Sequence, residues 1–271
     1  MRLAVLSDVH GNLPALEAVI ADARREGVDA FAVAGDVTGG PWSQETVERL
    51  RDLAGWMIAG NHEHYYLTYD RGDAPAGWYE SEQWAAMRWS YRRLNRTALD
   101  YISGLPEQVV VALPSADPIR IVHGTPNSMS AHLYPDRDPE VLAAFERAGL
   151  LRDGAGPPRL SEAIEDVAEP VLVCGHTHIA WVQREPHHLV VNAGSVGGPI
   201  NGDWRAQYIV LAWEGRQWNV DLRVVPYEIS RVRRAFETSG YLAEGGAVAR
   251  AILRGVETGR NVVGHLLRHV Y

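Results

Sequence analysis

Several features that mark particular classes of protein are missing from this chain. It has a single cysteine, Cys174, so no disulfide can form within it, and this usage is typical of a reducing compartment. One of the longest apolar runs, Tyr208–Trp213, is far shorter than the roughly 18 residues that a membrane-spanning helix needs. The segment Met1–Asp8 reaches an acidic residue too early for a secretory signal peptide. We therefore expect a cytoplasmic protein with no membrane association.

The chain also lacks an excess of basic residues. Its 26 Lys and Arg are outnumbered by 34 Asp and Glu, which gives a net charge of -8 and a pI of about 5.8. Because non-specific nucleic-acid binding depends on basic surface, this balance argues against it and disfavours a DNA nuclease. Hydrophobic residues make up 46% of the 271 positions, which is typical of a globular protein, and the sequence contains no internal repeat. The sequence predicts one domain over residues 1–271 and leaves the oligomeric state open.

Seven residues with metal-binding side chains occur in short polar phrases, most of which directly follow an apolar run. They are Asp8, His10, Asp36, Asn61, His123, His176 and His178. The apolar runs predict strands, so we expect these side chains at strand ends. Carboxylate, amide and imidazole ligands together suit two divalent cations held side by side. Each residue alone could belong to an ordinary turn or helix cap, but their recurrence indicates one metal site.

The first 62 residues alternate between strand and helix patterns. Strands are predicted at Arg2–Ser7, Phe31–Ala34 and Trp56–Ala59, with intervening helices that are capped by Asn12 and Ser43. Helical crossovers imply parallel pairing, and parallel strands bring the residues after their carboxyl ends to one edge of a sheet. We therefore expect the polar phrases of this region to meet at that edge.

Two helical insertions, at about 63–108 and 127–168, and a helical C-terminal extension, 226–271, are predicted around this framework. Between the insertions, Gln108–Leu113 and Ile119–Val122 predict a hairpin. A spacing of three or four residues within the first insertion predicts one amphipathic helix that carries Trp84, Met87, Tyr91, Leu94 and Ala98. The many aromatic side chains of this insertion could pack against the core or stack on a nucleobase, and the sequence leaves both roles open.

The order of the polar phrases resembles that of the calcineurin-like metallophosphoesterases. The matching phrases are Asp8-Val9-His10, Gly35-Asp36, Gly60-Asn61-His62-Glu63, His123 and Gly175-His176-Thr177-His178. Asn192–Gly197, followed by Gly202–Arg205, is similar to the compact bacterial and archaeal phosphodiesterase branch, which includes YfcE-like proteins. The resemblance covers roughly residues 1–225. It implies an α/β (α+β) fold, namely a four-layer α/β/β/α sandwich of two mixed sheets.

The resemblance also implies how the ligands are divided. One divalent cation would be held by Asp8, His10 and His178, the other by Asn61, His123 and His176, and Asp36 would bridge both. The ligand set accepts manganese, iron, nickel, cobalt or zinc, with manganese favoured in the cell and zinc a candidate in a crystal. Because the amide of Asn61 is neutral, two cations, two carboxylates and a bridging hydroxide leave one positive charge, which attracts a phosphate.

From this arrangement we expect hydrolysis of a phosphoester by a metal-bridging hydroxide. His62 is the candidate to protonate the leaving oxygen, with a supporting role beside the ligands as the alternative. Arg205 is a candidate for binding a phosphate oxygen, unless it makes a structural salt bridge. His132 follows His123 closely enough to line the same pocket.

The expected activity is that of a phosphodiesterase acting on a nucleotide-type or other small phosphodiester. The alternative is a phosphomonoesterase, which includes protein and nucleotide phosphatases. Protein phosphatases of this superfamily continue their Gly-Asp phrase with an Asp-Arg-Gly step, whereas here Gly35-Asp36 continues with Val37-Thr38, which disfavours them. A non-catalytic protein-binding scaffold is the third possibility. Such relatives usually lose ligands, and this chain keeps all seven.

Overall fold

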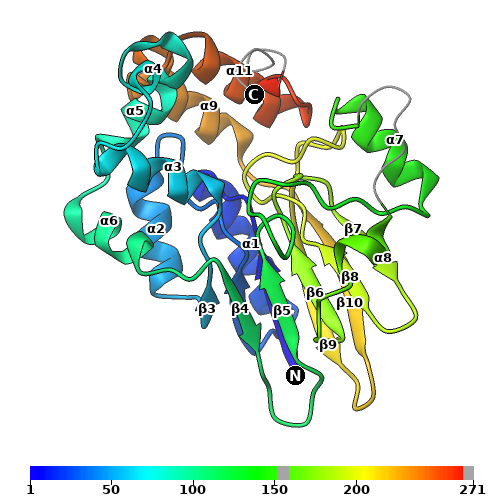
Figure 1. The fold of residues 1–271 in the computed structure, drawn as a ribbon. Helices are drawn as coiled ribbons and strands as arrows, with labels where there is room; N and C mark the ends of the chain where they lie inside the picture. The colour runs from blue at the N-terminus through cyan, green and yellow to red at the C-terminus, as the bar shows by residue number, and fades with distance from the viewer. Residues whose placement is uncertain (152–158, 265–271) are drawn as a thin grey trace.

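Two five-stranded mixed sheets lie face to face at the centre of the fold (Figure 1). The computed structural model describes residues 1–151 and 159–264. The first sheet contains, in spatial order, β10 (Trp218–Val225), β9 (Ala206–Trp213), β1 (Arg2–Leu6), β2 (Ala30–Val33) and β3 (Trp56–Met57). The second contains β4 (Gln108–Val111), β5 (Ile119–Val122), β6 (Val171–Cys174), β8 (Leu189–Asn192) and β7 (Trp181–Arg184). In each sheet three adjacent strands pair in parallel, β1 to β3 in one and β5, β6 and β8 in the other.

Helices cover the outer face of each sheet. The core beside the first sheet includes side chains from α1 (Leu13–Arg25), α2 (Ser43–Arg51), α3 (Asn61–Asp70), α5 (Ala85–Tyr91), α6 (Arg96–Ser103), α9 (Ile229–Thr238), α10 (Tyr241–Glu244) and α11 (Gly246–Thr258). The core beside the second sheet includes α7 (Pro139–Arg147) and α8 (Leu160–Ala163). The short helices α4 (Ala76–Glu80) and η1 (Glu82–Trp84) complete the set. With a third core between the sheets, the predicted four-layer sandwich is confirmed.

The first strand and helix show how the sequence specifies these layers. In β1, Leu3 and Val5 face the core between the sheets, while Ala4 and Leu6 face the helices. This alternation follows from the two-residue period of a strand, and both faces are apolar because both are buried. As predicted, Asn12 caps α1, where its side chain accepts a hydrogen bond from the Ala15 N–H at 3.2 Å.

Three local predictions require correction. Ser43 does not cap α2 but is its first residue, because its hydroxyl donates to the Gly39 carbonyl at 2.7 Å. The third strand ends at Met57 rather than Ala59, because the Ala59 N–H leaves the sheet and donates to the Pro106 carbonyl at 2.8 Å. The amphipathic helix is divided into η1, α5 and α6, because Asn95 begins a new helix by accepting a hydrogen bond from the Ala98 N–H.

The hairpin of β4 and β5 is confirmed, although β4 ends at Val111. The boundaries of the insertions and of the C-terminal extension stay predictions, and those at 127–168 and 226–271 include residues outside the described ranges. Within the described part of the chain, no helix is long and apolar enough to cross a bilayer. In Figure 1 the arrowheads of β5 and β6 point to the edge of the sandwich around which α3, α11 and α7 are placed.

Candidate metal centre

The polar phrases converge at the carboxyl ends of the parallel strands. We call the seven residues predicted as ligands the strand-end cluster: Asp8, His10, Asp36, Asn61, His123, His176 and His178. Three groups of side chains offer ligand atoms within 4.8 Å of one another. They are Asp8 with His10 and His178, His10 with Asp36 and His62, and Asp36 with His123 and His176. Asn61 joins them because its Oδ1 lies 3.0 Å from Nε2 of His123. The structure therefore brings all seven together, with His62 beside them.

The backbone of this cluster is strained in a consistent way. In the described residues, six positions other than glycine have a positive φ, and five of the six are predicted ligands. Those five are Asp8, His10, Asp36, His176 and His178, with φ between 47° and 65°. A left-handed backbone is unfavourable for such residues and is typical of functional sites, where the surrounding fold enforces it.

Two glycines in the motifs are required by close approach of the chain. A Cβ on Gly35, whose φ is +90°, would lie 2.7 Å from the backbone nitrogen of Gly60. A Cβ on Gly60 would lie 2.2 Å from Oδ1 of Asp36. Since neither position has room for a side chain, the two phrases can pack against each other and bring Asp36 next to the start of α3.

Two histidines are held by backbone carbonyls in the tautomer that a metal ligand needs. Nδ1 of His178 lies 2.6 Å from the Gly198 carbonyl, and Nδ1 of His123 lies 2.7 Å from the Ala34 carbonyl. Because a carbonyl only accepts hydrogen bonds, each Nδ1 carries a proton and donates it. In the neutral imidazole this leaves the lone pair on Nε2.

When the two imidazoles are neutral, as metal ligands are, these lone pairs face oxygen atoms that can only accept. Nε2 of His178 is 3.3 Å from Oδ1 of Asp8, and Nε2 of His123 is 3.4 Å from Oδ2 of Asp36. Oδ1 of Asp8 is buried without a hydrogen-bond partner, and Nε2 of His10 and Nε2 of His178 are only 3.0 Å apart. Lone pairs that converge in this way are stabilised by a cation between them, so the residues present fit a metal site.

The electrostatics of the cluster lead to the same requirement. Burial raises the pKa of Asp8, but His178 and His10 outweigh it and the net pKa lies well below the usual value. Burial lowers the pKa of His123, yet the Asp36 carboxylate prevails and raises it to about 10. Burial lowers the pKa of His176 to about 3, which keeps this imidazole neutral and able to bind a metal. The two buried carboxylates therefore need positive charge close by, which a proton on His123 supplies in the absence of a cation and which a bound metal ion would supply in its place.

Glu63 is a positioning residue that the sequence analysis missed. Its buried carboxylate accepts backbone hydrogen bonds from Asp36, Val37, Thr38 and Gly60 at 2.8 to 3.0 Å, and one more from the Thr38 hydroxyl. It thereby ties the loop that carries Asp36 to the turn that carries Asn61. The available signal was a Glu at the third position of a helix, from which a side chain reaches back to the preceding turn.

His62 lies beside the cluster on the first turn of α3. Its backbone N–H donates to Oδ1 of Asp36 at 2.8 Å, and its ring centroid is 4.4 Å from that of His10. Burial lowers the pKa of the His62 imidazole to about 4, although Asp36 acts in the opposite direction. With this pKa the imidazole is neutral at pH 7, so it can act as an acid beside the candidate ligands only once a nearby negative charge, such as that of a bound phosphoester, raises its pKa.

The two predicted substrate-binding residues differ in placement. The His132 ring centroid is 5.0 Å from that of His176, and its Nδ1 lies 2.8 Å from the Tyr134 hydroxyl, so His132 borders the cluster. Arg205 is exposed and forms a salt bridge with Asp203, to which its Nε donates at 3.0 Å. The structure thus places Arg205 in the salt bridge that was the alternative to phosphate binding.

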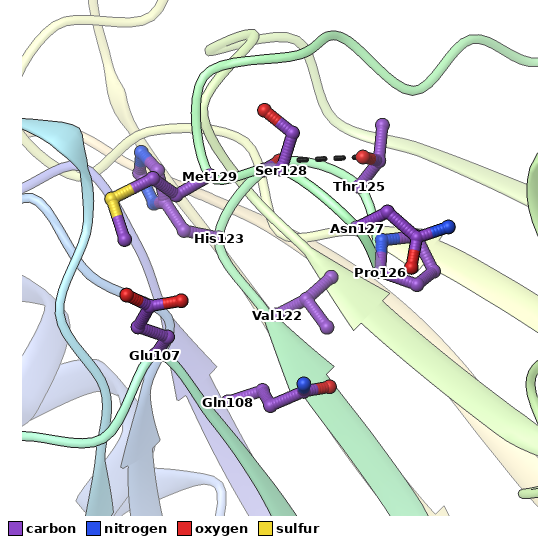
Figure 2. Close-up of a pocket in the computed structure, with 9 residues that line it drawn as sticks. All are labelled: Glu107, Gln108, Val122, His123, Thr125, Pro126, Asn127, Ser128 and Met129. Atoms are coloured by element: carbon purple, nitrogen blue, oxygen red, sulfur yellow. Dashed lines mark hydrogen bonds between the residues drawn. The ribbon is translucent and has the colours of Figure 1, made fainter.

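A pocket of about 250 Å³ borders the cluster at His123 (Figure 2). Figure 2 shows the Met129 side chain and the Glu107 carboxylate on the same side of the pocket as the His123 ring. The other lining residues are Gln108, Val122, Thr125, Pro126, Asn127 and Ser128. Apart from His123, none of these residues could be selected from the sequence, because they meet only where β4, β5 and the next loop come together.

Comparison with known proteins yields one family and several structural neighbours. A family model described as "Calcineurin-like phosphoesterase superfamily domain" matches residues 1–216. An uncharacterized protein of Methanocaldococcus jannaschii is 24% identical over 247 residues, which is 84% of this chain and 89% of that protein.

Two solved structures share the fold of almost the whole chain. A metallophosphoesterase from Sphaerobacter thermophilus has a TM-score of 0.71 at 24% identity and covers 96% of this chain and 99% of its own. A hypothetical protein from Pyrococcus horikoshii has a TM-score of 0.71 at 17% identity, with 95% and 98% covered. At these identities the likeness shows a common fold.

Proposed function

The chain belongs to the calcineurin-like phosphoesterase superfamily and is a metallophosphoesterase, and we propose that it hydrolyses small phosphodiesters, nucleotide-type ones in particular, with two divalent cations. One observation carries this proposal. Asp36 lies in two of the three groups of candidate ligands, once with His10 and His62 and once with His123 and His176. A carboxylate has two oxygens and can serve two neighbouring cations, which is the arrangement of two-metal hydrolases.

The strand-end cluster supplies a ligand set for each cation. One set is Asp8, His10 and His178, the other is Asn61, His123 and His176, and Asp36 serves both. Divalent cations in such a site supply an activated water and positive charge for the phosphoryl oxygens. Among the metals that accept this ligand set, we propose manganese as the resident one.

His62 has the placement of a residue that acts on the leaving oxygen. It is fixed by its own backbone hydrogen bond to Asp36 and by the first turn of α3, and its ring borders His10. We assign to it the delivery of a proton to the leaving oxygen. Because His62 is not needed to hold a cation in this assignment, its removal affects turnover more than metal content.

The surroundings of the cluster favour a small substrate. Figure 1 shows α3, α11 and α7 around the edge where the strands β5 and β6 end. A hydrogen bond links the segments that follow two of these helices. Nδ2 of Asn261, after α11, donates to the carbonyl of Ala148, after α7, at 3.0 Å. The pocket that borders His123 has a volume of about 250 Å³, which suits a small molecule rather than a duplex or a folded protein.

The proposal is tested by elemental analysis of the purified protein, followed by kinetics with manganese. We expect about two metal ions per chain and a higher kcat/KM for bis-p-nitrophenyl phosphate than for p-nitrophenyl phosphate. A preference for the monoester would instead make the protein a phosphomonoesterase. A metal-loaded sample that is inert toward a broad phosphoester panel would support a non-catalytic scaffold.

The role of His62 is tested separately with His62→Asn. A residue that protonates the leaving oxygen matters most when that oxygen is a poor leaving group. We expect kcat to fall about 10²- to 10⁴-fold for an alkyl diester and much less for the activated nitrophenyl ester. Equal losses for both substrates would rule out the acid role.

A further inference from the structure

Three aromatic side chains form a continuous surface that starts at His62. We call Tyr65, Trp78 and Trp84 the aromatic wall. The Tyr65 ring centroid is 5.7 Å from that of His62, and it is 5.4 Å from Trp78 and 5.6 Å from Trp84. The two indoles are stacked with centroids 3.9 Å apart. Flat rings therefore extend outward from the proposed leaving-group side of the metal centre.

The aromatic wall is not part of the hydrophobic core. Within the described residues, its three side chains belong to none of the three core clusters. From the same insertion, Trp89 belongs to the core beside the first sheet, and Tyr91 packs against it. All three rings of the wall are partly exposed. Partly exposed aromatic rings grouped beside a polar site are typical of binding surfaces.

The wall is also held in a fixed place relative to His62. Tyr65 is three residues after His62 on α3, so the two side chains lie on one face of the helix. The Arg88 guanidinium donates to the Trp78 carbonyl at 2.6 Å, and η1, which ends at Trp84, packs against α11. A preformed surface of this kind binds a ligand at a lower entropic cost than mobile side chains would.

We propose that the aromatic wall binds a flat ring carried by the leaving group of the substrate, so that Trp78 and Trp84 select ring-bearing phosphodiesters. The inference rests on the proposed function for the position of the phosphate and extends it to the group that is attached to the leaving oxygen. With phosphorus at the strand-end cluster and the leaving oxygen at His62, the group attached to that oxygen continues toward Tyr65. A nucleobase and an aryl group share the π-face that stacking requires.

The kinetic test uses Trp78→Ala and Trp84→Ala with three diesters. Two bear rings, a dinucleoside monophosphate and bis-p-nitrophenyl phosphate, and glycerophosphoglycerol bears none. We expect kcat/KM to fall about tenfold for the ring-bearing diesters, mainly through KM, and to stay unchanged for the ringless one. A loss confined to one ring-bearing diester identifies the preferred ring. Comparing each variant with wild type on the same substrate cancels the intrinsic reactivity of the leaving group.

Two further variants serve as controls. Trp78→Phe keeps an aromatic ring and should restore most of the loss. Tyr79→Ala removes a neighbouring exposed ring that stacks on Tyr69 rather than on the wall, and it should behave as wild type. An equal loss for the ringless diester, or no loss with any diester, would overturn the inference.

A binding measurement separates this inference from the proposed function. Adenosine and ribose carry no phosphoester, so neither can be hydrolysed, and ligand-observed NMR can compare their binding to the metal-loaded protein. We expect adenosine to bind to wild type and Tyr79→Ala but not to Trp78→Ala, and ribose to bind to none. If wild type were inert toward every diester while this binding pattern held, the proposed function would be wrong, but ring binding by the aromatic wall would be supported. If the diesters were hydrolysed but adenosine bound equally to Trp78→Ala, only ring binding by the aromatic wall would be contradicted.

Discussion

The strand-end cluster and the aromatic wall border the same site but are held in place by different means. The cluster consists largely of buried or half-buried side chains on strained backbone at strand ends, and its carboxylates and imidazoles constrain one another. The wall is partly exposed and comes from the first turns of α3 and the short helices α4 and η1. Under the proposed function the reaction depends on the cluster, whereas substrate preference is assigned to the wall. Substitutions in the cluster should therefore lower metal content and turnover, whereas substitutions in the wall should mainly change KM.

The largest effect is expected at Asp36, which both proposed cation sites share. Asp36→Asn retains the shape of the side chain but removes its charge, so both proposed sites lose their shared carboxylate ligand. We expect kcat/KM on bis-p-nitrophenyl phosphate to fall by about 10³-fold or more, with a lower metal content by elemental analysis. Asp203→Asn is the matched control, because Asp203 pairs with exposed Arg205. If Asp36→Asn retained both metals and activity, the cluster would not be the reactive region.

A smaller effect is expected at Glu63, which contacts the cluster only through backbone. Glu63→Gln replaces one acceptor oxygen by a donor amide, so the N–H groups that it faces lose their partner. We expect metal affinity to fall about 10- to 100-fold, with kcat partly restored at high manganese concentration. Glu80→Gln, on the exposed surface of α4, should change neither. An unaltered metal titration in Glu63→Gln would show that the cluster does not need this support.

The smallest effect is expected at a buried charge outside both regions. Asp22 accepts hydrogen bonds from the Tyr208 hydroxyl at 2.8 Å and from Arg223 at 3.1 Å. Burial raises the pKa of Asp22, but these partners outweigh it, and the net pKa lies below the ordinary value of 3.8. Asp22→Asn should lower the free energy of unfolding by about 1–2 kcal/mol at neutral pH and leave kcat/KM unchanged.

The pH dependence of this loss follows from the sign of the shift. Since the folded pKa of Asp22 is depressed, its stabilisation is fully present above the unfolded value and is lost as the pH falls through the folded value. The difference in unfolding free energy between wild type and Asp22→Asn should therefore shrink below pH 3.8. Urea unfolding at neutral and acidic pH measures it. A difference that is constant with pH would indicate lost packing rather than lost charge.

The convergence of the candidate ligands could be predicted because each of them stands in a short local motif. Each ligand follows an apolar run or a glycine turn, and parallel strands must bring such positions to one edge. Glu63 was missed because its role depends on four N–H groups that only the folded loop points at its carboxylate. Ser43 was misplaced because its hydroxyl bonds backward to Gly39, a contact that helix-capping preferences do not anticipate.

The sequence by itself determined which residues are candidate ligands, the parallel order of the first three strands and the apolar face of α1, because these follow from local periodicity and short motifs. Only the tertiary structure decided which ligands meet, since residues from Asp8 to His178 come from both sheets. It also decided that Trp78 and Trp84 stack. Six residues apart, they cannot share one face of a single helix, and they meet because the chain turns at Ser81, in an extended conformation between α4 and η1.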